Sequence, residues 1–486
     1  MDKEILGASL ALAALLLPVA AALLSCRVSA LKRWLLGVII PASCFVLVAV
    51  AAAVTPSESH YTLSFPRELP PVGLSVTADR PGLYFGMIVS AVWALVSIYC
   101  AWYLENDPHS GRFYTASLLS FSGTLGVALA GDMFTLFLFF ELMSLAAYVL
   151  IIHERTPESF SAGFKYLLMT IGGSLGLFFG LILTYHTAGS LSFARGPFGA
   201  SAGGFLAFMG YFLGFGIKAG VFPLHVWLPD AHPVAPSPAS ALLSGLMIKT
   251  GAFGLVRVIY QIFGVEYLGH TGWNMIPVYL GVVTIFIGSA VAILQDDLKR
   301  RLAYSSVAQI GYIVTGLSLL NHRALQGALF HVFGHALMKA SLFMAAGVII
   351  RLTGRRKVED LAGLGQHLPF TFFGFSIAAL SMVGIPPLVG FTSKWHIAWG
   401  ALDAGMPWIV AVLLISSFMN GIYYLPIVIS AFFKEKKPDI QLEGKEAPRV
   451  WVPITVLAAG IFLVGLVFGN IPLTLADQAA GSVLNP

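Results

Sequence analysis

Charged side chains are scarce in this sequence. Only 10% of its 486 residues are Asp, Glu, Lys or Arg, whereas a soluble domain carries about 25%. Hydrophobic residues make up 57% of the chain, and the mean hydropathy is +0.84. This balance excludes a water-soluble globule and a disordered chain. The apolar runs extend for about 20 residues at a time, which is long enough to cross a bilayer. The sequence therefore predicts an all-α polytopic membrane protein.

Cysteine is almost absent, which excludes a disulfide-stabilised secreted scaffold. Cys26, Cys44 and Cys100 have no metal-ligand spacing and form no CxxC motif, so an iron–sulfur or zinc site is not expected. The chain also lacks a Rossmann fingerprint and a P-loop. We therefore expect no cofactor in this chain and no path for electrons through it. The N-terminus lacks the basic region of a signal peptide, so residues 5–24 are interpreted as a retained span.

Fourteen transmembrane spans are expected, because fourteen apolar runs are separated by short polar or proline-containing segments. They cover about residues 5–24, 34–54, 83–104, 112–130, 133–153, 161–186, 204–224, 235–260, 274–294, 302–320, 323–351, 368–402, 406–433 and 450–470. The longest connection, 55–82, is expected to be an external loop. The chain then divides into four parts: 1–110 with the first three spans, 111–262 with spans 4–8, 263–434 with spans 9–13, and 435–486 with a cytoplasmic loop and span 14.

The basic residues predict the orientation. Odd-numbered loops hold seventeen Lys and Arg residues, among them Lys299, whereas even-numbered loops and the N-terminus hold six, among them Arg257. Positive charge marks the cytoplasmic side. We therefore expect an integral protein of a prokaryotic cytoplasmic membrane with both termini outside. The same topology explains the basic isoelectric point of about 9.0 without a nucleic-acid partner.

Spans seven and twelve indicate an internal repeat. Residues 216–227 and 384–395 match at four of twelve positions, 168 residues apart, and both stretches are interrupted by Gly and Pro. Such breaks at membrane depth usually mark an unwound backbone that lines a cavity. Since the two spans are an odd number of spans apart, they cross the membrane in opposite directions. This pattern predicts two inverted five-helix repeats, spans 4–8 and 9–13, with broken helices 7 and 12.

Ionisable residues inside the spans are the candidate functional groups. Placing a charged side chain at the bilayer centre costs about 3 kcal/mol or more, so such a residue indicates a functional or structural role. Glu141 is the acid expected deepest in the membrane, and Lys218, beside the first break, is its expected partner. A Lys–Glu pair that opens and closes would switch its proton affinity, as a proton relay requires. A structural carboxylate satisfied by hydroxyl groups is the alternative. Lys249, in the middle of span eight, is too far from either end to reach the headgroups.

His331, His335 and Lys339 follow one another at intervals of four residues and therefore share one helix face. Zinc binding would require a third ligand, and haem binding would require a histidine on a facing helix; the sequence marks neither. A polar stripe that carries protons through water fits best, because histidine titrates near neutral pH. Satisfied interior histidines are the alternative.

Four further residues complete the candidate set. His225, Asp230 and His232 follow Lys218 closely and could open a hydrated path to the cytoplasmic side, or form a capped turn between helices. Lys165, near the cytoplasmic end of span six, is explained almost as well by a side chain that extends to the headgroups.

Several of these segments resemble one known family. The matching segments are VFPLHVWLPDAHPVAPSPASALLSG after Lys218, FFELMSL around Glu141, SSVAQIGY, HVFGHALMKASLF and GIPPLVGFTSKW. They resemble the antiporter-like subunits of respiratory complex I, Mrp-type sodium/proton antiporters and membrane-bound [NiFe] hydrogenases, over roughly residues 110–430. The family fold of fourteen helices with two inverted five-helix units agrees with the pattern above.

The resemblance implies a role for each matching position. Glu141 corresponds to the glutamate of helix five, Lys218 to the lysine of broken helix seven, and Lys249 to the central lysine of helix eight. His331, His335 and Lys339 correspond to polar axis positions of helix eleven. Lys394 corresponds to the exit-side residue of helix twelve, where some members carry Glu.

We therefore expect a proton-translocating, non-catalytic subunit of a redox translocase of the NADH dehydrogenase or hydrogenase type. Its expected partners are other membrane subunits, including related antiporter-like subunits, and the lipid bilayer, with protons or sodium as the transported ion. Two alternatives stay open. One is a subunit of a Mrp-type antiporter without redox chemistry. The other is a stand-alone secondary transporter, which would need a midplane cavity large enough for a solute.

Overall fold

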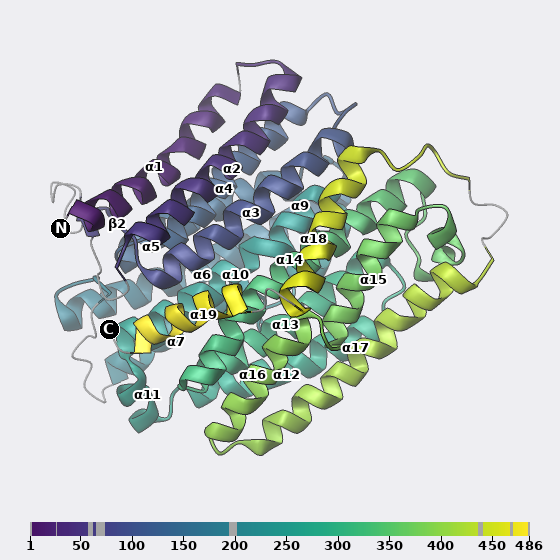
Figure 1. Ribbon diagram of the computed structural model, residues 1–486. Coiled ribbons are helices and arrows are strands. Elements are labelled where there is room, and N and C mark those ends of the chain that lie inside the picture. The colour runs from purple at the N-terminus through teal and green to yellow at the C-terminus, as the bar shows by residue number, and fades with distance from the viewer. Residues whose placement is uncertain are drawn as a thin grey trace.

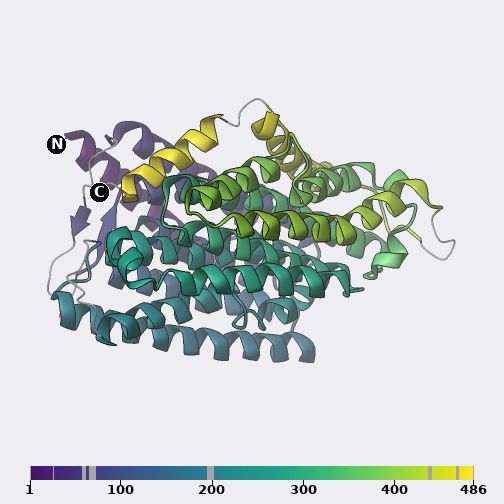
Figure 2. The same ribbon diagram turned by 90° about the horizontal axis from the view of Figure 1, so that it is seen from below.

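The computed structural model describes residues 2–25, 27–56, 62–64, 73–193, 202–435, 441–466 and 470–484. Its long helices lie roughly side by side in one bundle, and the first helix begins near the same end of the bundle at which the last helix ends (Figures 1 and 2). The helices of the first half are α1 (Asp2–Ser25), α2 (Ala30–Val54), α3 (Arg80–Tyr103), α4 (Ser110–Leu129), α5 (Met133–Ile151), α6 (Pro157–Ala188), α7 (Ala202–Ala219), α8 (Leu228–Val234), α9 (Ser237–Leu242), η1 (Leu243–Met247), α10 (Ile248–Val256) and η2 (Arg257–Phe263).

The second half of the chain is also helical. Its elements are α11 (Val265–Thr271), α12 (Met275–Ile293), α13 (Leu298–Ser318), α14 (His322–Thr353), η3 (Val358–Leu361), η4 (Leu364–Gln366), α15 (Pro369–Val383), α16 (Val389–Asp403), α17 (Pro407–Phe433), α18 (Pro448–Leu466) and α19 (Asn470–Leu484). The segment α9–η1–α10–η2 is one continuous rod in which two π-helical stretches, η1 and η2, flank α10.

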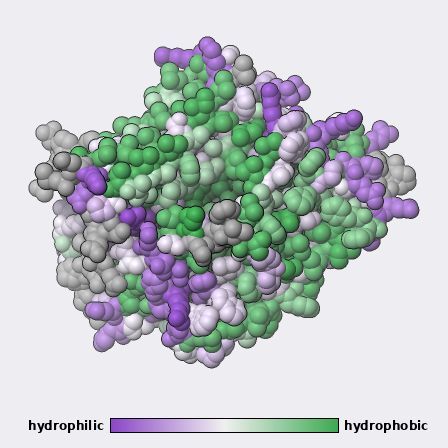
Figure 3. All heavy atoms as spheres, viewed as in Figure 1, coloured by the Kyte–Doolittle hydropathy of each residue, from purple (hydrophilic) through white to green (hydrophobic). Residues whose placement is uncertain are grey.

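Eleven helices of the described residues are long and apolar enough to cross a membrane. The chain is therefore an integral membrane protein, as the composition predicts. Figure 3 shows apolar residues over most of one face of the bundle and hydrophilic residues gathered toward its margins. In the rod formed by residues 237–263, all residues of the most hydrophobic stretch are buried inside the bundle. In the most hydrophobic stretch of α6, only one third of the residues are buried. The rod therefore belongs to the interior of the bundle and α6 to its surface.

Polar caps fix where several helices begin. The side chains of Asp132, Thr156, Asp297 and Asn321 each accept a hydrogen bond from the backbone N–H three residues later. Such caps satisfy N–H groups that a helix cannot pair itself. They fix where these four helices begin.

The two predicted helix breaks are present. Helix α7 ends at Ala219, and the chain is irregular until α8, while α15 ends at Val383 and α16 begins at Val389. Each break starts with a glycine in the left-handed region, Gly220 (φ 82°) and Gly384 (φ 94°). A proline follows three residues later in both, at Pro223 and Pro387. Both the glycines and the prolines lie 164 positions apart. The offset between the breaks thus differs from the 168 residues between the sequence matches by four residues, about one helical turn.

The structure corrects three other expectations. The chain is not purely α-helical, because β1 (Thr62–Ser64) and β2 (Ser75–Thr77) pair antiparallel in the predicted external loop. A further helix, α19, follows the last predicted span and packs against α3 and α14 (Figure 1). Arg257 and Lys299 are not loop charges, since they lie inside η2 and α13 with 0% and 4% of their surface exposed.

Candidate functional site

Glu141 of α5 and Lys218 of α7 form no direct ion pair. Lys218 is buried at the last turn of α7, and its Nζ donates to the hydroxyl oxygens of Ser144 at 3.0 Å and Tyr166 at 2.8 Å. Glu141 is half-buried on α5, and its Oε1 accepts from Ser174 Oγ at 2.5 Å. Since Ser144 stands one turn after Glu141 on α5, the hydroxyl groups lie between acid and base.

Lys249 occupies the centre of the bundle. It is completely buried on α10, directly after the π-helical stretch η1, and its Nζ donates to the backbone carbonyl of Ser244. It lies within electrostatic range of His232, His331, His335 and Lys339. The structure thus brings the central lysine of the first half together with the polar face of α14.

The α14 residues form one stripe, as their spacing predicts. The rings of His331 and His335 stack with centroids 5.8 Å apart. His331 contacts Ser393 Oγ through Nδ1 at 2.7 Å and Gln309 Oε1 through Nε2 at 3.0 Å. Both ring nitrogens of His335 are buried without a protein hydrogen-bond partner in the described part of the chain.

Lys339 continues this stripe toward α13 and α17. Its side chain is completely buried, and Nζ donates to the carbonyl of Leu302 at 2.8 Å, to Ser305 Oγ and to Tyr424 OH at 3.4 Å. The hydroxyl oxygens of Ser305 and Tyr424 are themselves 2.9 Å apart. Lys339 is therefore surrounded by neutral oxygens.

Lys394 lies at the second helix break and points inward. Only 7% of its surface is exposed, and Nζ donates to the carbonyls of Met382 at 2.9 Å and Val383 at 3.1 Å and to Ser417 Oγ at 3.1 Å. These carbonyls end α15, where the break leaves them without helical partners. Nζ also lies 4.8 Å from the centre of the Tyr312 ring, which in turn faces His331 at 5.8 Å.

Polar side chains link these positions unevenly. Ser244 Oγ and Ser306 Oγ are 2.7 Å apart, which connects the surroundings of Lys249 to α13, next to the Ser305 that holds Lys339. On the other side of Lys249 the link is weaker, because Thr250 Oγ1 meets the sulfur of Met143 at 3.6 Å. Hydrogen bonds thus link the surroundings of Lys249 to α13, and His331 to Ser393 next to Lys394. Among the described residues no hydrogen bond joins Lys218 to Lys249, and none reaches the ring nitrogens of His335.

The secondary candidates fall into two groups. Asp230 bridges two basic side chains at the surface, since one carboxylate oxygen contacts Lys165 and the other lies 2.8 Å from Arg300 Nη2. His232 instead is fully buried on α8 and stacks on Phe343 at 4.7 Å, and neither of its ring nitrogens has a protein partner among the described residues. Thus Lys165 belongs to a surface ion-pair cluster, whereas His232 belongs to the interior.

His225 lies in the irregular stretch between α7 and α8. It is buried, its ring faces those of Phe222 and Tyr304 at 5.7 and 6.3 Å, and its Nδ1 has no protein partner in the described part of the chain. Along the chain it lies between the buried Lys218 and Asp230 of the surface cluster.

One buried ion pair, formed by Arg257 and Asp79, does not follow from the sequence patterns described above. Arg257 of η2 is fully buried and donates from both terminal nitrogens to the carboxylate of Asp79, which precedes α3. The guanidinium also donates to Gln261 Oε1 at 2.8 Å and lies over the rings of Phe193 and Phe253. The usable signal was present, because Arg257 is a charge only eight residues after Lys249 in an apolar helix.

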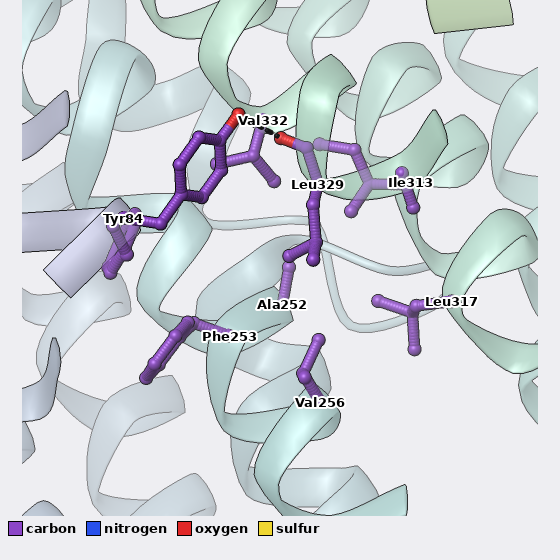
Figure 4. Close-up of a pocket in the computed structure, with 10 residues that line it drawn as sticks. Tyr84, Ala252, Phe253, Val256, Ile313, Leu317, Leu329 and Val332 are labelled. Carbon is purple, nitrogen blue, oxygen red and sulfur yellow. Dashed lines mark hydrogen bonds between the residues drawn. The ribbon is translucent and has the colours of Figure 1, made fainter. Parts of the chain in front are cut away.

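The pocket in Figure 4 lies between α3, α10, α13 and α14. Its volume is about 10 Å³, which is room for about one water molecule. Apolar side chains line it, and the one polar feature drawn is the Tyr84 hydroxyl, which donates to the carbonyl of Leu329 at 3.3 Å. This pocket cannot hold an organic solute. Within the described residues, no group of three or more His, Cys, Asp or Glu side chains could hold a metal ion.

The geometry defines a class of protein: an integral membrane helix bundle with two broken helices and a row of buried lysines and histidines. Residues 130–420 match the NADH:quinone oxidoreductase/Mrp antiporter transmembrane family, and the chain belongs to that family.

Relatives from different complexes are similar over most of their length. The chain is 37% identical to NADH-quinone oxidoreductase subunit N of Desulforudis audaxviator, over 84% of both chains. It is 29% identical to a Na(+)/H(+) antiporter subunit of Bacillus subtilis, covering 87% of this chain and 86% of that protein. A chain of the Mrp complex from Dietzia sp. DQ12-45-1b has the same fold, with a TM-score of 0.87 at 24% identity, covering 99% of this chain and 98% of the other.

Proposed function

We propose that this chain is a proton-translocating, antiporter-like subunit of a multi-subunit membrane complex related to respiratory complex I. Protons are relayed along the row formed by Glu141, Lys218, Lys249, the α14 stripe and Lys394. The chain itself carries no redox chemistry. It works in a prokaryotic cytoplasmic membrane.

One observation carries this proposal. Within the described residues, none of the buried lysines Lys218, Lys249, Lys339 and Lys394 has a carboxylate within 4.0 Å, and their Nζ atoms donate to hydroxyl and carbonyl oxygens. A buried lysine in a permanent ion pair cannot give up its proton without leaving a carboxylate charge unpaired. Lysines held by neutral oxygens avoid that penalty, so the row suits proton transfer rather than structural pairing.

Unpartnered polar atoms support a hydrated connection between the lysines. Both ring nitrogens of His232 and His335 and the side-chain nitrogen of Gln309 are buried without protein partners in the described ranges. Buried polar groups are usually satisfied, and ordered water is the usual partner where protein offers none. Water at these atoms would extend the row across gaps that exceed hydrogen-bond reach.

We further propose that the chain crosses the membrane fourteen times, with both termini outside. In this arrangement α7–α8 and α15–α16 each count as parts of one interrupted span, and α4 and α13 are spans as well. Residues 111–262 and 263–434 then form two inverted five-helix repeats. The glycine and proline that recur 164 positions apart at the two breaks support the repeat.

The relatives favour a subunit over a stand-alone transporter. The relatives from Desulforudis audaxviator and Bacillus subtilis are both named as subunits, one of an NADH-quinone oxidoreductase and the other of a Na(+)/H(+) antiporter. The Mrp-type alternative, with sodium exchanged for protons, keeps support from the second of these relatives. The oxidoreductase relative is the more similar of the two, and this favours the complex I-related assignment.

Paired substitutions test the relay. Glu141→Gln and Lys218→Met should abolish proton movement by the purified complex in vesicles, while the complex still assembles, because each removes a titrating group without a large change in volume. Lys165→Met is the matched control, since its ion pair with Asp230 lies at the surface. Wild-type transport rates in both Glu141→Gln and Lys218→Met, at equal assembly, would contradict the relay.

The identity of the co-purifying subunits separates the two assignments. Flavin, iron–sulfur or [NiFe] subunits would identify a redox-driven pump. Their absence, together with sodium-dependent proton movement, would identify a Mrp-type antiporter.

A further inference from the structure

A cleft on the side of the bundle combines two arginines with an apolar wall. It lies between α2, α4 and α5 and has a volume of about 460 Å³. Its mouth carries the side chains of Arg33 and Arg112. Its wall is made by Ala116, Leu119, Ala146 and Val149. None of these residues belongs to the row of candidate relay residues.

Both arginines are held in the cleft by hydrogen bonds to backbone carbonyl oxygens. Arg33 Nε donates to the carbonyl of Ser25 at 3.1 Å, which fixes the side chain near the end of α1. A Cβ at Gly111 would lie 2.9 Å from Arg33 Nη1, so the glycine allows this guanidinium to rest against the first turn of α4. Arg112 follows Gly111 directly and donates from Nη2 to the carbonyl of His153 at 2.5 Å.

Neither arginine has an acidic partner in the described part of the chain, where no carboxylate lies within 4.0 Å of either. Asp107 and Glu154 stand near Arg112, and Asp107 Oδ2 contacts His153 Nε2 at 2.6 Å. The cleft therefore carries two guanidinium groups, neither of which is in a direct ion pair with a described carboxylate.

The wall continues into the surface that meets lipid. Leu145 of α5, next in the chain to Ala146 of the wall, is 57% exposed, and Leu35 and Ile39 of α2 are 39% and 54% exposed. A ligand that fits must therefore be anionic at one end and apolar along its length. We propose that this cleft binds a phospholipid with an anionic headgroup, whose phosphate contacts Arg33 and Arg112 and whose acyl chain lies against α4 and α5. Arginine pairs with phosphate through two parallel hydrogen bonds, and basic pockets between transmembrane helices select anionic headgroups.

Lipid retention by the purified full-length chain, with the subunits with which it assembles, tests the site. The sample is exchanged into nanodiscs of phosphatidylcholine with a small fraction of phosphatidylglycerol of the same acyl chains, and retained phosphatidylglycerol is measured by native mass spectrometry. The double variant Arg33→Gln/Arg112→Gln should lower retention about twenty-fivefold, because each basic residue contributes about fivefold. The matched control is Arg27→Gln/Lys32→Gln, which removes the same charge from exposed residues nearby and should retain the lipid.

A second variant separates lipid from other occupants. Val149→Phe places a larger side chain in the cleft and leaves both arginines unchanged, so it should also abolish phosphatidylglycerol retention. This variant decides the matter if the arginine variant fails to fold. Equal retention in Val149→Phe and the wild type would overturn the proposal. A thermal stabilisation by inorganic phosphate equal to that by phosphatidylglycerol would also overturn it. So would a cross-link from position 149 to another subunit, because that subunit would then occupy the cleft.

Discussion

The buried pair of Arg257 and Asp79 offers the sharpest test of how this interior is stabilised. Arg257→Met removes the cation and keeps an apolar side chain of similar length. Asp79→Asn removes the charge but keeps the cap of α3, because Asp79 Oδ1 accepts from Gly82 N at 3.0 Å and Asn caps helices as well as Asp. Each single variant therefore leaves one buried charge without its partner.

The expected cost follows from burial and geometry. The two side chains are 0% and 3% exposed, and the guanidinium binds the carboxylate through both terminal nitrogens. Removing one partner of such a pair costs about 3–5 kcal/mol, since the remaining charge cannot reach water. The double variant leaves no charge, so its loss should be smaller than the sum of the single losses by about 2–3 kcal/mol.

Thermal unfolding of the purified chain in mild detergent measures these differences. The matched control is Arg323→Gln, which breaks a pair with Asp403 whose side chains are 54% and 39% exposed. An exposed pair contributes about 0.2–1 kcal/mol, so this variant should change stability little. Two results would contradict this prediction: a loss of stability in the buried single variants no larger than in Arg323→Gln, or single losses that simply add in the double variant.

Three further predictions concern the proposed relay, the first helix break and the loop after α3. Lys394→Ala should stop proton movement in vesicles while Lys165→Ala reduces it little; equal loss in both would contradict the proposed route. Gly220→Ala should lower stability by about 1–2 kcal/mol, because φ is 82° and a Cβ would meet Leu228; an unchanged melting temperature would refute this. In the loop after α3, burial raises the pKa of Asp107, but hydrogen bonds from His153 and the His109 N–H outweigh it and lower the pKa. The stability that this carboxylate contributes is present above its unfolded pKa, near 4, and is lost as pH falls through the lower folded pKa. Asp107→Asn should therefore weaken the acid dependence of unfolding in that range, and an identical pH profile would contradict it.

Much of the fold was predictable because its signals are local. Apolar runs and the Gly–Pro interruptions at 220–223 and 384–387 act within a few residues, and the helices and breaks fall close to the predicted positions. The α14 stripe was predictable for the same reason, since a spacing of four residues is a helical contact. The two breaks recur at an offset of 164 residues, whereas the four sequence matches are 168 residues apart. A difference of four residues is about one helical turn and keeps the apolar pattern in phase, so the matches alone did not reveal it.

The partners of the buried lysines could not be predicted, since they depend on packing between distant segments. Tyr166 is 52 residues before Lys218, and Tyr424 is 85 residues after Lys339. Serine and tyrosine are common in apolar helices, and nothing in the sequence marks which of them faces a lysine. Likewise Arg257 and Asp79 are 178 residues apart, and counting Arg257 by its place in the chain assigned it to a loop.

The π-helical stretch η1 has a consequence for insertions and deletions. A π turn holds one residue more than an α turn, so residues 243–247 shift the helical phase of everything that follows them in the rod. If all five residues of this stretch adopted α-helical turns, Lys249 would be rotated about the helix axis by about 100°, the angle of one residue, and would turn away from the α14 stripe. Removing one residue from the stretch would instead convert it to a regular α-helix and leave Lys249 facing nearly the same neighbours. A single-residue deletion should therefore be less harmful at residues 243–247 than in the α-helical part of the rod before them.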